Sequence, residues 1–269
     1  MTLKKLLIKV HLADSKNSHC NKPTSQQVNN LNNEWNNKMS DTYLITGANR
    51  GIGLEMSRSI LAAGDRLIAI CRQPAQATEL NALVAASNGA GVVYAADACD
   101  EAALNAISAQ VKGAIDVVVC NAGVISARGG IEDTDNNAAA ISEVLMTNMA
   151  GPFFTARAFL GQLKSSKNPR IAIISSYMGS QQHGGTSAHF YRASKAGANN
   201  LMVTLSHELK SSGITVTSFH PGWVRTDMGG AGADISPQES AAGLLARFRG
   251  LTLKQSGAFL NYDGKTLPL

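Results

Sequence analysis

Short apolar stretches alternate along the chain with longer segments whose apolar residues recur every three or four positions. The short stretches are rich in Val, Ile and Leu and lack polar alternation, which predicts strands buried on both faces. The longer segments have the spacing of amphipathic helices. Strands are predicted at 42–46, 67–71, 91–95, 115–119, 170–175, 215–219 and 257–261. Helices are predicted at 54–63, 79–86, 101–111, 190–211 and 238–247, with one long or two helical segments over 138–163, interrupted at Gly151-Pro152.

The order of these elements predicts an α/β fold. Buried strands separated by helices are typical of a parallel sheet that is covered by helices on both faces. We therefore expect a single, doubly wound domain whose parallel sheet has about seven strands. This domain is expected to span residues 40–269, because Met39-Ser40-Asp41 directly precedes the first predicted strand.

Residues 1–39 differ in composition from the rest of the chain. After the short basic and apolar stretch LKKLLIKV, the segment becomes polar and ends in the asparagine-rich VNNLNNEWNNKM. Such a sequence cannot bury enough apolar area to offset the entropy lost on ordering. It lacks both the A-x-A cleavage site of a signal peptide and the arginines of a transit peptide. We expect a disordered N-terminal tail or a misplaced start.

Positive charge is concentrated in the same segment. The chain has a net charge of +5, but residues 40–269 hold 18 basic and 17 acidic side chains. A nearly neutral domain has no general attraction for phosphate backbones, so no nucleic-acid partner is expected. The chain has no run of 18 apolar residues, so no membrane helix is predicted. Four widely separated cysteines, without metal-ligand or disulfide spacing, predict a reducing, cytoplasmic location and no bound metal.

A glycine-rich loop, TGANRGIG at 46–53, follows the first predicted strand. Its glycines have the spacing G-x-x-x-G-x-G, and a predicted helix follows at once. Glycines at such a turn let a pyrophosphate approach the backbone, and the helix N-terminus offers unpaired N–H groups. An ordinary glycine turn would look similar in isolation, but the strand, turn and helix context favours dinucleotide binding.

This loop and several later motifs resemble those of the short-chain dehydrogenase/reductase family. Cys120-Asn121-Ala122-Gly123 is similar to the family's Asn-Asn-Ala-Gly segment, with cysteine replacing the first asparagine. Asp97 follows the third predicted strand, where the family contacts adenine, and Pro221-Gly222 begins a segment similar to the one around the nicotinamide. The resemblance covers about residues 40–269 and implies a Rossmann-type fold. HPGWVRTDMGG and the ending FLNYDGK look most like the C-factor-like branch.

The resemblance also implies which residues bind a nicotinamide cofactor. NADP(H) is favoured over NAD(H), because Cys71 occupies the end of the second strand, where an acidic residue would bind the ribose 2′-OH. Arg50 and Arg72 together fit a 2′-phosphate, although either one alone would be an ordinary surface charge. The expected cofactor-binding residues are Gly47, Asn49, Arg50, Gly51, Ile52, Gly53, Arg72, Asp97, Asn121, Ala122, Gly123, Tyr191, Lys195, Pro221, Gly222, Val224 and Thr226.

Four residues, Asn148, Ser176, Tyr191 and Lys195, match the catalytic tetrad of the family. Tyr191 and Lys195 are four positions apart in a predicted helix, so they share one face; by itself such a pair would be an ordinary surface pair. A nearby ammonium would lower the pKa of the tyrosine and let the phenol act as general acid or base. Ser176, preferred over Ser175, would donate to the substrate oxygen. The resemblance gives Asn148 the role of holding a water that links the lysine to solvent.

The loop between Ser176 and Tyr191 is longer than the family usually has, which predicts an insertion at the substrate mouth. His183 and His189 lie in this loop. Either histidine could touch substrate, but a solvated loop histidine is the simpler interpretation. The glycine-rich segment DMGGAGADISPQ after Thr226 is predicted to form a mobile lid.

Two functions fit the sequence. The first is an NADP(H)-dependent oxidoreductase that transfers hydride between the nicotinamide and a small carbonyl or alcohol substrate. The alternative is a nucleotide-bound, C-factor-like signalling or scaffold protein with little turnover. The resemblance further implies a homodimer or homotetramer, paired through helices over 151–163 and 190–211.

Overall fold

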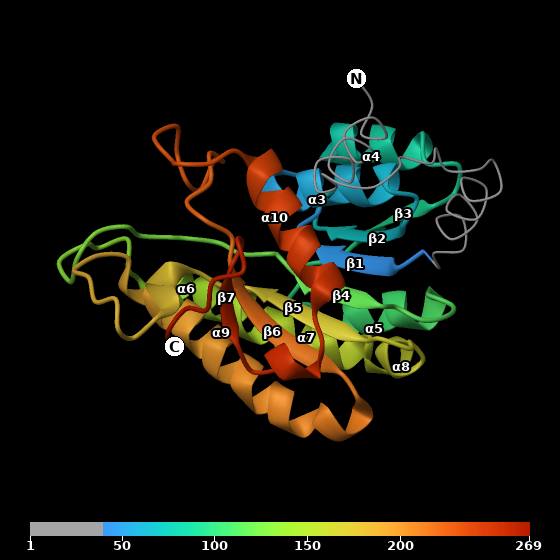
Figure 1. Cartoon of the computed structure of the whole chain (residues 1–269). Coiled ribbons are helices and arrows are strands. Elements are labelled where there is room, and N and C mark those ends of the chain that lie inside the picture. The colour runs from blue at the N-terminus through green and yellow to red at the C-terminus, as the bar shows by residue number, and fades with distance from the viewer. Residues whose placement is uncertain (1–39) are drawn as a thin grey trace, which may run out of the picture. The chain divides into compact units, whose positions relative to one another are not determined.

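A seven-stranded parallel sheet forms the centre of the fold (Figure 1). In the computed structural model, which describes residues 40–269, the strand order is β3-β2-β1-β4-β5-β6-β7. Neighbouring strands run parallel throughout, with Thr42 opposite Arg66 and Val117 opposite Arg170. The strands are β1 (Thr42–Thr46), β2 (Arg66–Cys71), β3 (Gly91–Ala95), β4 (Val117–Cys120), β5 (Arg170–Ile174), β6 (Thr215–His220) and β7 (Phe259–Asn261).

Helices cover both faces of this sheet, as Figure 1 shows. The helices α3, α4 and α10 pack on one face, where Ile60 and Leu244 are fully buried. The helices α5, α7 and α9 pack on the other face, where Leu104 and Met202 are fully buried. The helices are α3 (Gly51–Ala62), α4 (Thr78–Ala85), α5 (Glu101–Gln110), α6 (Ala138–Leu145), α7 (Gly151–Ala158), α8 (Leu160–Lys164), α9 (His189–Glu208) and α10 (Pro237–Gly250).

These elements confirm the predicted α/β fold with a single parallel sheet of seven strands. The prediction over 138–163 was too simple, because three helices occupy this region. A π-helical turn, Met146–Ala150, joins α6 to α7, and the helix breaks again at Phe159. Pro152 explains the irregular turn, since it has no N–H to donate to the carbonyl of Asn148 and its ring clashes with that group in a regular helix.

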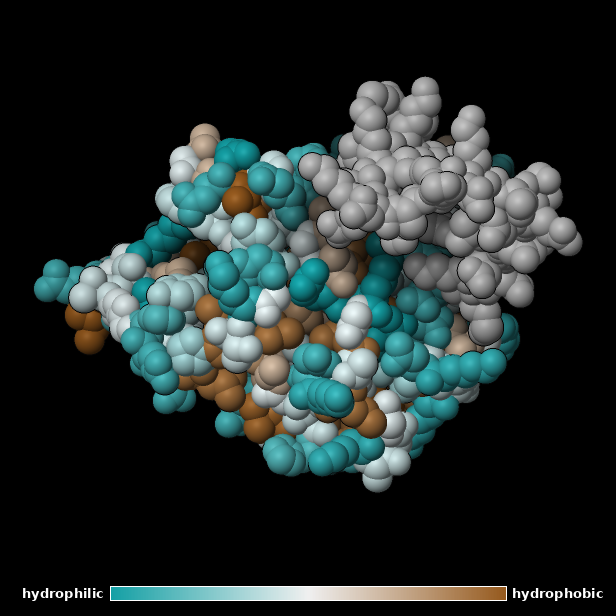
Figure 2. Space-filling view, in the orientation of Figure 1, coloured by the Kyte–Doolittle hydropathy of each residue, from teal (hydrophilic) through white to brown (hydrophobic). Residues whose placement is uncertain are grey.

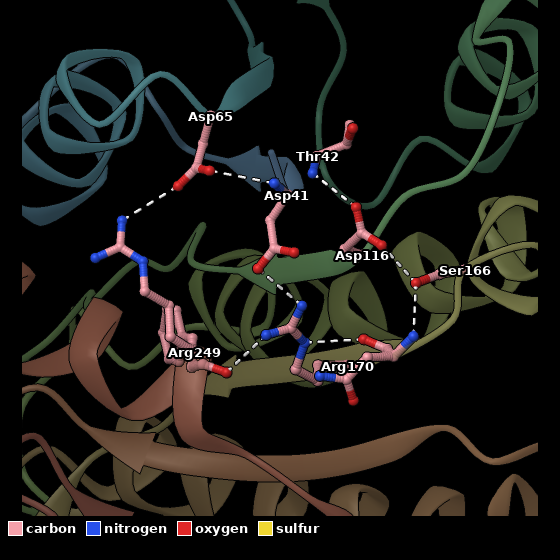
Figure 3. Close-up of polar contacts among 9 residues, drawn as sticks. Asp41, Thr42, Asp65, Asp116, Ser166, Arg170 and Arg249 are labelled. Atoms are coloured by element: carbon pink, nitrogen blue, oxygen red, sulfur yellow. Dashed lines mark hydrogen bonds and ion pairs between the residues drawn. The ribbon is translucent and has the colours of Figure 1, made fainter. Parts of the chain in front are cut away.

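A network of polar side chains joins the amino ends of the strands (Figure 3). Arg170, the first residue of β5, is only 2% exposed and donates to the Asp41 carboxylate over 2.9 Å. Its guanidinium also donates to the carbonyl oxygen of Phe248 over 3.1 Å. Asp65 accepts from the backbone N–H of Asp41 and pairs with Arg249. The network extends to Thr42, Asp116 and Ser166. Polar contacts, most of them partly buried, therefore hold the amino ends of the strands together.

Residues 40–269 form one compact unit. The predicted tail, residues 1–39, lies outside the described residues. Among the helices of 40–269, none combines the length and the apolar character that a bilayer crossing requires. Figure 2 shows hydrophobic and hydrophilic residues interspersed over the visible face, with several hydrophobic ones along the lower edge, over α9.

Candidate active site

A cleft opens at the carboxyl ends of the central strands. The chain crosses over in opposite directions on the two sides of the β1 and β4 pair, which is the usual place for a ligand in a doubly wound sheet. The cleft has a volume of about 1000 Å³. Residues from the loops after β1, β2, β3, β4 and β6 and from α9 line it, among them Gly47, Asn49, Arg50, Gly51, Ile52, Gly53, Arg72, Asp97, Asn121, Ala122, Gly123, Tyr191, Lys195, Pro221 and Thr226.

The glycine loop forms a cradle that side chains would fill. Gly47 has φ +67° and Gly51 has φ +53°, so both adopt the left-handed backbone that favours glycine. A Cβ atom on Gly53 would collide with the carbonyl oxygen of Gly47, and one on Gly51 would lie 3.2 Å from the Thr226 methyl group. Glycine at position 53 thus lets the loop pack closely on itself, and glycines at 47 and 51 permit the left-handed turns that shape it.

The N-terminus of α3 points into this cradle without a side-chain cap. Asp100, Asn137 and Ser236 cap α5, α6 and α10 by accepting from backbone N–H groups. In contrast, Arg50 at the start of α3 makes no such bond, and the first turn holds no acidic residue. The N–H groups and the positive end of the helix dipole can therefore receive an anion, as the pyrophosphate of a dinucleotide requires.

Asn121 ties the end of β4 to the glycine loop. Its side-chain amide donates to the carbonyl oxygens of Thr46 and Gly47 over 3.1 and 3.0 Å. The Thr46 hydroxyl accepts from the backbone N–H groups of Asn121 and Ala122, each over 3.2 Å. Cys120, which replaces the family's first asparagine, is buried and leaves these contacts intact.

Lys195 brings a buried ammonium to the cleft from α9. Its side chain is 4% exposed, and its Nζ donates to the carbonyl oxygen of Ile174, the last residue of β5, over 2.8 Å. Burial lowers the pKa of Lys195 to about 8. A Cβ atom on Gly123 would lie 3.4 Å from this Nζ, so the glycine keeps the space beside the ammonium open.

Tyr191 lies one helical turn before Lys195, but its pKa differs from the expected direction. Burial raises the pKa of the phenol, while a hydrogen bond from Ser176 and the positive charge of Arg128 act to lower it. The Lys195 ammonium is 5.7 Å from the centre of the Tyr191 ring and bonds to Ile174 instead of the phenol oxygen. The expectation that the ammonium sets a low phenol pKa is therefore not met in this arrangement.

The two adjacent serines after β5 have different contacts. The Ser175 hydroxyl donates to the backbone carbonyl of Lys195 over 3.2 Å. Ser176 accepts from the N–H of Met178 over 3.1 Å, and its hydroxyl reaches the phenol of Tyr191. The serine that meets the phenol is thus Ser176, although Ser175, and not Ser176, is among the residues that line the cleft.

Asn148 lies in the π-helical turn and is 1% exposed. Its side-chain oxygen accepts from the N–H of Val124, and its amide donates to the carbonyl of Val124, both over 2.8 Å. The amide also donates to the Ser194 hydroxyl over 3.0 Å. The side chain of Asn148 therefore fixes the loop after β4 against α9.

Both arginines expected at the 2′-phosphate have an acidic partner. Arg72 lies 3.8 Å from the carboxylate of Asp97, and Arg50 lies 3.1 Å from that of Asp227. Burial acts to raise the pKa of Asp97, but hydrogen bonds from Cys99 and the charge of Arg72 hold it below its usual range. Both ion pairs are on the surface, where such pairs add little stability and exchange readily.

The segment after β6 contributes only part of its expected residues to the cleft. Pro221 and Thr226 line the wall. Val224 is 4% exposed, and its backbone pairs with that of Ile235. Gly222 has φ +89°, and a Cβ atom there would meet the Ile235 side chain at 2.5 Å. Val224 and Gly222 thus shape this segment from behind the cleft surface.

The structure also places the two loop histidines and one arginine that the sequence did not single out. His183 is half-buried and stacks on the exposed Tyr177 with ring centres 3.8 Å apart, whereas His189 is exposed. Arg128 follows the Asn121-Ala122-Gly123 motif, and its charge acts on Tyr191. No motif or spacing marks Arg128, since it reaches the site only through the folding of its loop.

Comparisons with known proteins agree with this geometry. A sequence profile for the short chain dehydrogenases matches residues 41–234. The chain is 35% identical to C-signal of Myxococcus xanthus over 159 residues, which are 58% of this chain and 93% of that protein.

Two solved structures show the same fold. An NADPH-bound carbonyl reductase from chicken fatty liver superposes with a TM-score of 0.79 at 33% identity, covering 86% of this chain and 99% of that one. The carbonyl reductase Sniffer of D. melanogaster superposes with a TM-score of 0.81 at 29% identity, covering 86% of this chain and 100% of that one. The chain belongs to the short-chain dehydrogenase/reductase family of NAD(P)-dependent oxidoreductases.

Proposed function

We propose that the chain reduces small carbonyl compounds with NADPH and that Tyr191 donates the proton. One observation supports this most directly. The Tyr191 phenol, which lies beside Ser176, opens into the same cleft as the uncapped N-terminus of α3. The names of the chicken and D. melanogaster carbonyl reductases support the same substrate class.

The bound nicotinamide would supply the hydride that goes to the carbonyl carbon. Tyr191 gives its phenolic proton to the carbonyl oxygen, so that the C=O group becomes CH–OH, with one new C–H and one new O–H bond. Ser176 donates a hydrogen bond to the same oxygen and stabilises the charge that develops on it. Because burial raises the pKa of Tyr191, the phenol keeps its proton at neutral pH, which suits reduction better than oxidation.

Lys195 holds the nicotinamide ribose and returns the proton to Tyr191. Its ammonium stays charged at neutral pH, because its pKa is about 8. Of its three N–H donors, one is used by Ile174. The side chain of Asn148 is occupied by Val124, so we assign the water-holding role to the main-chain carbonyl of Asn148, which Pro152 leaves without its regular helical partner.

Three features of the cleft support NADPH over NADH. The end of β2 holds Cys71, a buried and neutral residue, in place of a carboxylate. Arg72 and Arg50 line the same wall, with side chains 60% and 64% exposed, and their guanidinium groups can turn to a 2′-phosphate. The remaining expected cofactor contacts, and the assignment of residues 40–269 as the whole functional domain, belong to this proposal.

We also propose that two copies of the chain associate through α7 and α9. Figure 2 shows hydrophobic residues over α9. Met149, in the π-helical turn before α7, lies next to Gly197 of α9 and is 37% exposed. Light scattering at micromolar concentration tests the pairing, and a monomer would reject it.

The alternative is a C-factor-like signalling protein that binds nucleotide with little turnover, favoured by the likeness to C-signal. A turnover assay separates the two functions. NADPH consumption is followed with a panel of aldehydes and ketones, and NADPH binding is measured by calorimetry. Binding with steady turnover of a carbonyl compound supports the reductase. Binding without turnover on any member of the panel supports the alternative.

A further inference from the structure

Arg128 is an exposed arginine that bonds to a residue of the cleft wall, and the proposed reaction assigns it no role. Arg128 lies in the loop after β4, and its Nη2 donates to the backbone carbonyl of Met228 over 2.6 Å. Met228 lines the cleft and follows Asp227 in the segment after β6. Figure 1 shows these two loops, green and orange, on the side of the sheet where the strands end. The guanidinium thus bridges two loops that border the substrate position.

The backbone beside Arg128 is fixed by its neighbours. The N–H of Gly129 donates to the Asp133 carboxylate over 2.8 Å. The carbonyl of Gly129 accepts from the N–H of Ala188 over 3.2 Å, next to the start of α9. These contacts, together with the bond to Met228, connect Arg128 with three segments around the site. The backbone beside Arg128 is therefore held in place, while its guanidinium is exposed and its charge acts on the phenol of Tyr191.

Arg128 differs from the other arginines around the cleft, because within residues 40–269 it has neither a carboxylate partner nor a second hydrogen bond. Arg50 and Arg72 pair with carboxylates. Arg225 donates to the carbonyls at 233 and 234, and Arg192 donates to those at 183 and 187. Within residues 40–269, no carboxylate lies within ion-pair distance of Arg128, and its one hydrogen bond goes to a backbone carbonyl. A guanidinium has five N–H donors, so most of them are available.

We propose that Arg128 binds a carboxylate on the carbonyl substrate, so that the preferred substrates are oxo acids. The inference rests on the proposed reductase function and names its substrate class. The guanidinium bonds to Met228 of the cleft wall and its charge acts on Tyr191, so a substituent of a carbonyl compound bound at Tyr191 can extend toward it. A carboxylate there can accept two parallel N–H bonds, and the geometry of guanidinium favours this pairing over a single point contact.

The test compares acids with their methyl esters, which keep the carbon skeleton and remove the charge. The probes are pyruvate, acetoacetate and 4-oxopentanoate, each with its methyl ester, because they place the carboxylate at increasing distance from the carbonyl. For at least one pair, wild type should show a kcat/KM about tenfold or more higher for the acid, since charge-assisted hydrogen bonds are the strong ones. Arg128→Gln should lose kcat/KM for the acid far more than for the ester, so that the preference disappears, and Arg128→Lys should keep part of it.

Arg50→Gln is the matched control, because Arg50 contacts Asp227, the neighbour of Met228, from the cofactor side. It should weaken NADPH binding without changing the ratio of acid to ester. Equal kcat/KM for acid and ester in wild type at every chain length overturns the proposal. An unchanged ratio in Arg128→Gln, with wild-type melting temperature and NADPH affinity, overturns it as well.

A binding measurement keeps the inference separate from the proposed function. Tyr191→Phe with bound NADPH is titrated with the three acids by calorimetry, and the same titration is made with Arg128→Gln added. At least one acid should bind about tenfold more weakly after loss of Arg128. Equal binding overturns the role of Arg128 even if the enzyme is an active reductase. Weaker binding supports the role even if no carbonyl compound turns over.

Discussion

The ammonium of Lys195 donates a hydrogen bond to the carbonyl oxygen of Ile174 over 2.8 Å, which joins α9 to the last residue of β5. Two residues after Ile174, the Ser176 hydroxyl reaches the phenol of Tyr191, one helical turn before the lysine. The end of β5 and the helix α9 therefore hold the Lys195 ammonium, the Ser176 hydroxyl and the Tyr191 phenol in place together. In this position Lys195 is almost completely buried, which lowers its pKa to about 8.

The lowered pKa of Lys195 predicts how stability depends on pH. The ordinary pKa is 10.5, so between about pH 8 and 10.5 the unfolded chain holds a proton that the folded chain has released. Stability therefore rises with pH in this range relative to a variant without the lysine. Melting temperatures of wild type and Lys195→Met, without nucleotide, are compared from pH 7 to 9.5. The difference should move in favour of wild type as the pH passes 8, and a constant difference would contradict the assignment.

The two serines after β5 should separate into catalytic and structural roles. Ser176→Ala removes a donor at the developing oxyanion, so kcat should fall by about 10²-fold or more with little change in melting temperature. Ser175→Ala removes the buried bond to the Lys195 carbonyl, which should lower the free energy of unfolding by about 1 kcal/mol and leave kcat close to wild type. Steady-state kinetics and urea unfolding measure both variants. The reverse pattern would assign the donor to Ser175.

The cofactor preference should depend on the two arginines of the cleft. Arg72→Gln and Arg50→Gln each remove a charged partner of a 2′-phosphate, so the KM for NADPH should rise about tenfold in each, while the KM for NADH stays within about twofold. Asp227→Asn is the control, because it releases Arg50 from its ion pair and should not weaken NADPH binding. A wild-type enzyme that already prefers NADH would show that the arginines do not select the cofactor.

The ion pair of Arg170 with Asp41, at the amino ends of the strands, predicts a variant that loses stability but keeps its catalytic activity. Asp41→Asn leaves the guanidinium of Arg170, 2% exposed, without its opposite charge, so the free energy of unfolding should fall by about 1.5–3 kcal/mol. Glu101→Gln is the control, because the pair of Glu101 with Arg157 is about half exposed on both sides and should contribute less than about 1 kcal/mol. Urea unfolding measures both. Activity per folded molecule should stay unchanged in Asp41→Asn, since the cleft lies at the opposite edge.

The sequence predicted what depends on local pattern. The run Val117–Cys120 is apolar on both faces and forms a central strand, although the prediction began two residues early. Ile115 is buried but bonds to the Gln162 carbonyl instead of a neighbouring strand, which no periodicity reveals. The glycine spacing located the cradle because backbone conformation at Gly47 and Gly51 depends on residue type.

Other features depend on contacts between distant segments, which the sequence does not show. The acidic partners of Arg50 and Arg72 come from 177 and 25 positions away. The hydrogen bond of Lys195 to Ile174 and the charge of Arg128 near Tyr191 depend on how loops and helix ends meet. Spacing on one helix brought Tyr191 and Lys195 together but did not predict the direction of the tyrosine pKa, because burial outweighs the neighbouring groups.

The most direct test of the proposed mechanism is turnover by Tyr191→Phe. The substitution keeps the ring and removes only the transferable proton and the bond to Ser176. With a carbonyl substrate and saturating NADPH, kcat should fall by about 10²–10⁴-fold, while calorimetry shows NADPH binding within about threefold of wild type. A folded Tyr191→Phe enzyme that binds NADPH and reduces the same substrate at the wild-type rate would contradict Tyr191 as the proton donor.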